Sequence, residues 1–110
     1  GPVAYCGQVI LNGGTEQWSR QGIYALYGSL LNGRPVYIHE SGDNFLFHVV
    51  VDQSLRFWYI STDIGNSDIG AIRVEDSALS AERITGTWEA YSIQDDWVLE
   101  PGMSTSCKAS

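Results

Sequence analysis

The chain has 110 residues, of which 44% are hydrophobic, and these include four Trp, six Tyr and three Phe. This length fits one domain with its own core, and the apolar content excludes disorder caused by low hydrophobicity. Thirteen acidic residues against six basic ones give a net charge of −7. Such a charge repels the phosphates of nucleic acid, so nucleic acid is excluded as a partner. No apolar run approaches the roughly 20 residues of a membrane helix, and we expect no membrane insertion.

Short runs rich in β-branched and aromatic residues alternate with clusters of Gly, Asn, Asp and Ser, a pattern typical of antiparallel all-β domains. In chain order, the expected strands cover residues 7–11, 23–31, 34–40, 45–51, 55–61, 71–75, 84–91 and 97–99. We expect one short helical turn within residues 77–83. The polar tail at residues 103–110 is expected to be loose apart from its cysteine.

Two turn signals set the expected pairing of the central strands. The Asn-Gly pair at residues 32–33 is the stronger one, because both residues tolerate the positive φ of a tight hairpin turn. The Ser-Gly pair at residues 41–42 predicts a second hairpin with Ile38 opposite Phe45. Alternation then gathers one apolar face, which we predict to be a core face. Its members are Val36, Ile38, Phe45, Phe47, Val49 and Val51.

The parity of the next loop decides which residues extend that face. An even-length loop adds Trp58 and Ile60, whereas an odd-length loop adds Phe57 and Tyr59. We favour Trp58 and Ile60.

The opposite face of these strands carries Tyr37, Leu46 and Val50. It is either covered by other strands, as the second half of the core, or exposed as a binding patch. We favour the covered arrangement.

The chain has two cysteines, Cys6 and Cys107, and they bracket everything with a folded pattern. Paired cysteines at domain boundaries are typical of secreted and cell-surface proteins and unusual in the cytosol. We therefore predict a Cys6–Cys107 disulfide and an extracellular or cell-surface location. The alternative is two unrelated buried thiols. The predicted fold is all-β: a compact antiparallel β sandwich or flattened barrel of about eight short strands, closed by this terminal disulfide.

The first two residues, Gly1 and Pro2, are interpreted as the remnant of a protease site used to remove a purification tag. Residues 3–110 then form a single β domain. On this interpretation we expect a fragment of a larger multidomain protein, whose neighbouring domains are further partners.

Several short motifs are spread over most of the chain. They are Gly22-x-Tyr24-x-Leu26, Asn32-Gly33-Arg34-Pro35-Val36-Tyr37, Phe45-Leu46-Phe47, Phe57-Trp58-Tyr59-Ile60-Ser61, Gly65 and Ile84-Thr85-Gly86-Thr87-Trp88. Together they resemble a small extracellular β module that recurs in multidomain adhesion or scavenger-type proteins of marine invertebrates. The resemblance implies an extracellular, modular protein, and none of its motifs is a catalytic signature.

The sequence gives little support to catalysis or to a metal. A serine nucleophile needs a base and an orienting acid, yet His39 and His48 lie outside known nucleophile motifs. Zinc spacings such as Cys-x-x-Cys are absent, so we expect solvated or edge histidines and no metal. The acidic residues leave paired carboxylates for glycoside hydrolysis open, but a cleft in so small a domain would be shallow. We predict no enzyme and no cofactor, with a small hydrolase as an alternative.

A loop with oxygen-bearing side chains surrounds Gly65. Its residues Asp63, Asn66 and Asp68 are a weak calcium candidate, because the loop lacks the spaced ligands and the closing Glu of a calcium-binding loop. These residue types are also what polar turns use. We favour the polar turn.

The aromatic residues exceed what so small a core can bury, so some rings are expected at the surface. Exposed aromatic rings anchor protein interfaces and stack on sugars. The predicted ligand-binding residues are Trp18, Tyr24, Tyr37, Tyr91 and Trp97. We therefore predict a noncatalytic recognition or adhesion module of a secreted or cell-surface protein, which binds a protein partner. The alternative ligand is a glycan of the cell surface or extracellular matrix.

Overall fold

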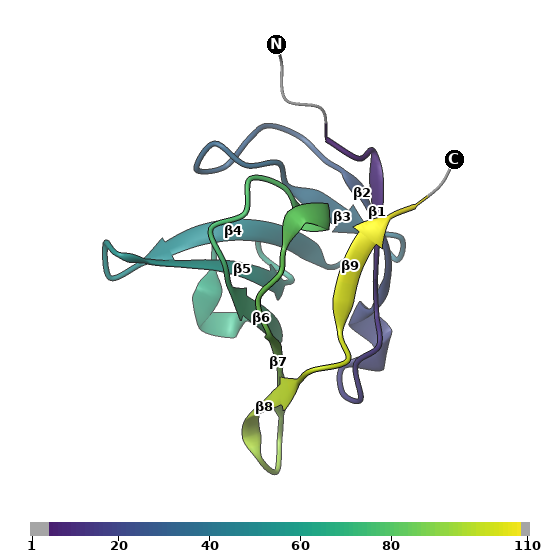
Figure 1. Ribbon diagram of the computed structural model, residues 1–110, viewed down its shortest axis with the longest axis vertical. Coiled ribbons are helices and arrows are strands. Elements are labelled where there is room, and N and C mark those ends of the chain that lie inside the picture. The colour runs from purple at the N-terminus through teal and green to yellow at the C-terminus, as the bar shows by residue number, and fades with distance from the viewer. Residues whose placement is uncertain (1–4, 109–110) are drawn as a thin grey trace.

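The computed structural model describes residues 5–108 and consists of one antiparallel sheet with the strand order β8-β7-β6-β5-β4-β3-β2-β1-β9. The strands are β1 (Gln8–Asn12), β2 (Gly22–Leu26), β3 (Tyr37–His39), β4 (Phe45–Val51), β5 (Leu55–Ser61), β6 (Ile72–Glu75), β7 (Trp88–Ser92), β8 (Asp96–Glu100) and β9 (Ser104–Cys107). Single 3-10 turns form η1 (Trp18–Arg20), η2 (Ser67–Ile69) and η3 (Ala81–Arg83). The sheet curls into a half-barrel (Figure 1), which confirms the all-β prediction. The interpretation of Gly1 and Pro2 lies outside the described residues.

The two longest strands, β4 and β5, have the predicted bounds, because runs of β-branched and aromatic residues end at clear turn residues. The prediction of a loose tail is wrong at β9, which pairs with β1 and places Thr105 opposite Leu11. The buried Thr105 hydroxyl donates a hydrogen bond of 2.6 Å to the Ala81 carbonyl of η3. Strand β9 thus joins the sheet through backbone pairing, although its side chains carry no apolar pattern. The tail's last residues, 109–110, are not described.

Both predicted turns form. Asn32 and Gly33 adopt φ values of 53° and 74°, and Leu31 and Arg34 exchange backbone hydrogen bonds of 2.8 and 3.0 Å across them. In the next hairpin, Ile38 lies opposite Phe45, as predicted.

The extension of the Phe47 face by Trp58 and Ile60 was predicted wrongly. The β4–β5 loop has the odd length of three residues, 52–54, so Phe47 lies opposite Tyr59 and Val49 opposite Phe57. Asp52 and Gln53 both adopt positive φ in this loop. The odd loop length places Trp58 and Ile60 on the other face.

The two faces of the sheet form two separate cores. The larger core lies on the inner face of the half-barrel and includes Tyr37, Leu46, Trp58, Ile60 and Trp88, all buried. The covered arrangement that we favoured for this face is therefore found at Tyr37 and Leu46, whereas Val50 near the end of β4 is 38% exposed. The smaller core lies on the outer face and consists of Val36, Phe47, Val49 and Tyr59, with Phe57 and Trp97 packed against it.

The predicted disulfide joins Cys6, which precedes β1, to Cys107 at the end of β9, with 5.7 Å between the Cα atoms. The two cysteines are 101 residues apart in sequence. The two ends of the described chain, near residues 6 and 107, therefore lie side by side (Figure 1). Among the described residues, no helix is long and apolar enough to cross a bilayer.

Candidate functional site

The outer face of the sheet is hollowed where η1 and η2 meet the hairpin of β7 and β8. One hollow of about 410 Å³ is lined by Gln17 and Arg20 of the η1 segment, by Asp68 and Ile69 of η2, and by Tyr91 and Trp97 of the hairpin. A second hollow of about 420 Å³ shares Gln17 and Tyr91 with the first and extends to Ile93 at the hairpin turn. We call the two hollows together the recognition groove.

One wall of the groove is a loop that follows β1, and a buried carboxylate holds this loop. Glu100 of β8 accepts hydrogen bonds from the Thr15 backbone N–H at 2.6 Å, the Thr15 hydroxyl at 2.7 Å and the Glu16 N–H at 2.9 Å. Gly14 lies so close to Glu100 and Met103 that a Cβ there would clash with both side chains. Hydrogen bonds and close packing therefore hold this loop against Glu100 at the end of β8.

Gln17 links this loop to the hairpin and to η1. Its backbone is left-handed, with φ 57°. The side-chain amide nitrogen Nε2 of Gln17 donates a hydrogen bond of 2.6 Å to the backbone carbonyl of Tyr91. The Gln17 side-chain oxygen accepts from Arg20 Nη1 at 2.6 Å, and Arg20 Nε donates to Asn44 Oδ1 at 2.9 Å. The guanidinium of Arg20 is thus held in place at the groove.

Trp97 is held by its neighbours on the outer face. The guanidinium carbon of Arg73 lies 3.9 Å from the centre of the Trp97 ring, and Arg73 also pairs with Glu89 at 2.9 Å. The rings of Tyr91 and Tyr59 pack edge to face with Trp97, with centroids 5.7 and 6.4 Å away. One face of the indole is therefore covered by a cation.

The five predicted ligand-binding residues divide into two groups. Tyr24 and Tyr37 belong to the inner core with 0% exposure, so the prediction that they contact a ligand is wrong. Tyr37 accepts a hydrogen bond from the Ala81 N–H, and burial raises the pKa of Tyr37 to about 12. Tyr91 and Trp97 come together in the groove. Trp18 is 69% exposed and lies in the chain between the lining residues Gln17 and Arg20.

Several lining residues were not predicted. Gln17, Arg20, Asp68 and Ile69 belong to loops whose sequences show only turn character, so their convergence depends on the tertiary fold. Ile93 did carry a signal, because a large apolar residue in a polar turn is unusual, and it is 94% exposed.

The loop around Gly65 is a polar turn. Asn66 Oδ1 accepts from the Asp68 N–H at 3.0 Å, and the Asn66 amide nitrogen lies 3.4 Å from Asp63 Oδ2. The side chains of Asp63 and Asn66 thus interact with each other, and the Asn66 side chain also accepts from the backbone of Asp68, as is typical of a polar turn.

Both histidines are buried, so the prediction of solvated or edge histidines is wrong. His39 Nε2 lies 2.7 Å from the Gln21 carbonyl, and the Ser41 hydroxyl lies 2.7 Å from His39 Nδ1 and 2.5 Å from Asp43 Oδ1. The hydroxyl stands between the imidazole and the carboxylate, whereas an activated serine needs the imidazole in the middle. This cluster orders the β3–β4 turn.

The chain matches no protein-family model, no curated protein and no solved structure. The resemblance to an extracellular module of marine invertebrates accordingly stays a prediction.

Proposed function

We propose that the chain is a noncatalytic recognition module of a secreted or cell-surface protein and that it binds a protein partner in the recognition groove. The observation that carries this proposal is the pair of neighbouring hollows that share the lining residues Gln17 and Tyr91. Exposed apolar side chains flank this polar junction, namely Ile69, Tyr91 and Ile93. Apolar anchors around oriented polar groups are typical of protein interfaces.

A protein ligand fits the groove better than a sugar does. Sugar binding by stacking needs an open ring face, and Arg73 already covers one face of Trp97. Tyr91 and Ile93 are exposed apolar groups that can pack against the side chains of a partner. The second candidate ligand, a glycan, is favoured by one observation, the 69% exposure of Trp18.

The disulfide supports the extracellular part of the proposal. Disulfides form and persist in secreted and cell-surface proteins and are rare in the cytosol. Adhesion is the function that this location and a protein ligand suggest together.

A displayed library of random peptides tests the proposal with the whole chain as bait. We expect enriched peptides whose affinity falls at least tenfold on Ile93→Ser or Tyr91→Ala, because each change removes an apolar anchor. Leu79→Ser is the matched control, since Leu79 is an exposed apolar residue that does not line the groove, and it should leave affinity unchanged.

Two outcomes would overturn the protein-ligand proposal. One is the absence of enriched peptides, and the other is enrichment that the groove variants leave intact. A glycan array that shows binding lost on Trp18→Ala would then select the second candidate.

A further inference from the structure

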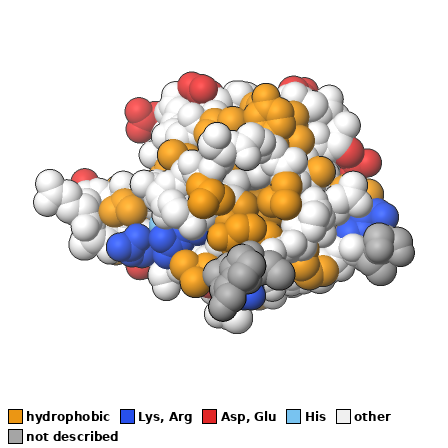
Figure 2. All heavy atoms as spheres, turned by 90° about the horizontal axis from the view of Figure 1, so that it is seen from above, with side chains coloured by type: hydrophobic (Ala, Val, Ile, Leu, Met, Phe, Trp, Pro, Cys, Tyr) orange, Lys and Arg blue, Asp and Glu red, His pale blue; other side chains and the backbone are white. Residues whose placement is uncertain are grey.

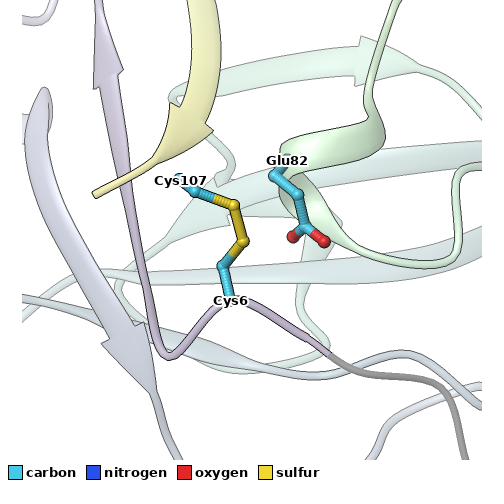
Figure 3. A group of neighbouring side chains, drawn as sticks. All are labelled: Cys6, Glu82 and Cys107. Carbon is cyan, nitrogen blue, oxygen red and sulfur yellow. A yellow bond between two sulfur atoms is a disulfide. The ribbon is translucent and has the colours of Figure 1, made fainter. Parts of the chain in front are cut away.

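The side chain of Glu82 lies beside the disulfide. Figure 3 shows it reaching from η3 toward the Cys6–Cys107 bond. One ligand atom from each of Cys6, Glu82 and Cys107 lies within 4.8 Å of the others, and no other such group of three occurs among residues 5–108. The sequence analysis found no zinc spacing because these residues are far apart in the chain, and the fold brings them together.

One oxygen of this carboxylate is left without a partner. Glu82 Oε2 accepts a hydrogen bond of 2.7 Å from the Ser80 hydroxyl, whereas Oε1 is buried and no donor in the described part of the chain reaches it. The side chain of Glu82 is only 13% exposed, and the nearest cation, Arg83, lies at 3.8 Å from Oε2. An unpaired buried carboxylate oxygen is costly unless a cation or donor satisfies it.

Both cysteines line a hollow that is open to solvent. This hollow of about 480 Å³ is lined by both cysteines together with Leu26 and Lys108. Hydrophobic side chains gather on the face of the molecule drawn in Figure 2, and Leu26 in the lining of this hollow is exposed. A small reductant and a metal ion can therefore reach the disulfide without unfolding of the sheet.

We propose that reduction of the disulfide turns Cys6, Cys107 and Glu82 into a zinc site. A trialkylphosphine breaks the S–S bond, and the disulfide takes up two electrons and two protons while the phosphine becomes its oxide with oxygen from water. Zn²⁺ then displaces the two thiol protons and binds both thiolates, as zinc binding to cysteine generally does. Glu82 Oε1 is the third ligand, and a fourth position stays open toward the hollow.

The geometry of the three residues suits this ion. At Zn–S distances of about 2.3 Å, two sulfurs of a tetrahedral site stand roughly 3.8 Å apart. Cysteines with Cα atoms 5.7 Å apart can reach that separation by side-chain rotation. Thiolates and a carboxylate are ligands that zinc accepts together. The ion would connect the end of β9 to η3 and to the segment before β1. In the oxidised protein the disulfide connects β9 to the segment before β1, and the Thr105–Ala81 hydrogen bond connects β9 to η3.

Zinc titration of the phosphine-reduced chain tests this proposal, which does not rest on the proposed function. We expect stoichiometric Zn²⁺ to protect both thiols from alkylation and to raise the Tm of the reduced protein by at least about 5 °C. The oxidised protein should not respond to Zn²⁺. If the reduced chain is unfolded, Zn²⁺ should restore its β-sheet circular dichroism.

The Glu82→Gln variant identifies the third ligand. It keeps the shape of the side chain and replaces the negatively charged carboxylate ligand by a neutral amide, so the zinc affinity of the reduced protein should fall at least tenfold. Glu75→Gln is the matched control at an exposed position and should leave the affinity unchanged.

Three results would overturn the proposal. They are a reduced wild-type protein that neither gains stability nor refolds with Zn²⁺, equal zinc affinity of Glu82→Gln and wild type, and an equal response of the oxidised protein.

Discussion

His48 is a titratable residue in the buried core. Its side chain on β4 has no exposure and packs edge-on against Trp58, with ring centroids 5.5 Å apart. Neither ring nitrogen has a hydrogen-bond partner among the described residues. Burial, together with the nearby charges of Arg34 and Arg56, lowers the pKa of His48 to about 4. At neutral pH the ring is therefore uncharged and behaves as an apolar core residue.

We predict that this histidine makes the fold sensitive to acid. In the unfolded chain His48 takes up a proton near pH 6.5, whereas in the folded chain it does so only near pH 4. The unfolded state thus binds more protons as pH falls through this window, and stability is lost between pH 6.5 and 4. The loss attributable to His48 should be on the order of 3 kcal/mol at pH 4, measured by urea unfolding at several pH values.

The variant His48→Phe isolates this effect from the titration of the carboxylates. It keeps a ring against Trp58 and cannot take up a proton, so its stability should change less than that of the wild type between pH 7 and 4. Equal losses in both proteins would contradict the assignment.

The burial of individual aromatic residues was only partly predictable. The surplus of rings correctly implied surface aromatics, and Tyr91 and Trp18 are exposed. It could not identify them, because the side of β2 and β3 that carries Tyr24 and Tyr37 becomes the inner one only when the whole sheet curls into the half-barrel. Alternation fixes which residues share a face and leaves open which face is inside.

Strand β8 and the loop that follows β1 are coupled by Glu100, and this coupling supports the groove. We predict that Glu100→Gln lowers the free energy of unfolding by about 2 kcal/mol. Both carboxylate oxygens of Glu100 accept hydrogen bonds, and in glutamine one of them is replaced by an NH₂ group, which is itself a donor and cannot accept. Urea unfolding measures this loss. Binding of a groove ligand should weaken as well, since Gln17 lies in the same loop.

The exposed residue Glu75 offers a matched control for this change. Glu75→Gln should alter stability by less than about 0.5 kcal/mol. If Glu100→Gln were equally harmless, the loop would be held by other contacts.

The strands were predictable where local chemistry determines them. The bounds of β4 and β5 and the turn at residues 32–33 follow from composition and turn residues. The face of Trp58 was mispredicted because every residue of β4 except His48 is apolar, so neither face is marked as the solvent side. Strand β9 was missed because its Ser-Thr-Ser-Cys sequence is stabilised by pairing with β1, which a local pattern cannot show.

The whole molecule explains why the sequence analysis identified only some residues of each candidate site, namely Tyr91 and Trp97 of the groove and the two cysteines of the proposed zinc site. The groove combines loops near residues 17, 68 and 91, and the proposed zinc site combines residues 6, 82 and 107. Curling of one sheet into a half-barrel brings these distant segments together (Figure 1). The disulfide was predictable for a different reason, because two cysteines allow only one pairing and their positions at the chain ends match a closed domain.

The disulfide should stabilise the molecule strongly without being required for its topology. Closing a loop with cysteines 101 residues apart is worth about 4–5 kcal/mol in the chain-entropy model. We predict that the double variant Cys6→Ser and Cys107→Ser loses up to this amount in urea unfolding.

The double variant should nevertheless keep its β-sheet circular dichroism at neutral pH, because contacts other than the sulfur bond hold β9 in place. Strand β9 pairs with β1 along its length, the Lys108 N–H donates to the Gln8 carbonyl at 2.9 Å, and Thr105 is bonded to Ala81 of η3. Hydrogen exchange of the β9 amides is the decisive measurement. If exchange in the double variant is faster than in the wild type only at β1 and β9, the disulfide stabilises only the pairing of these two strands. Faster exchange at every amide would contradict the prediction, because it would show that the whole half-barrel depends on the disulfide.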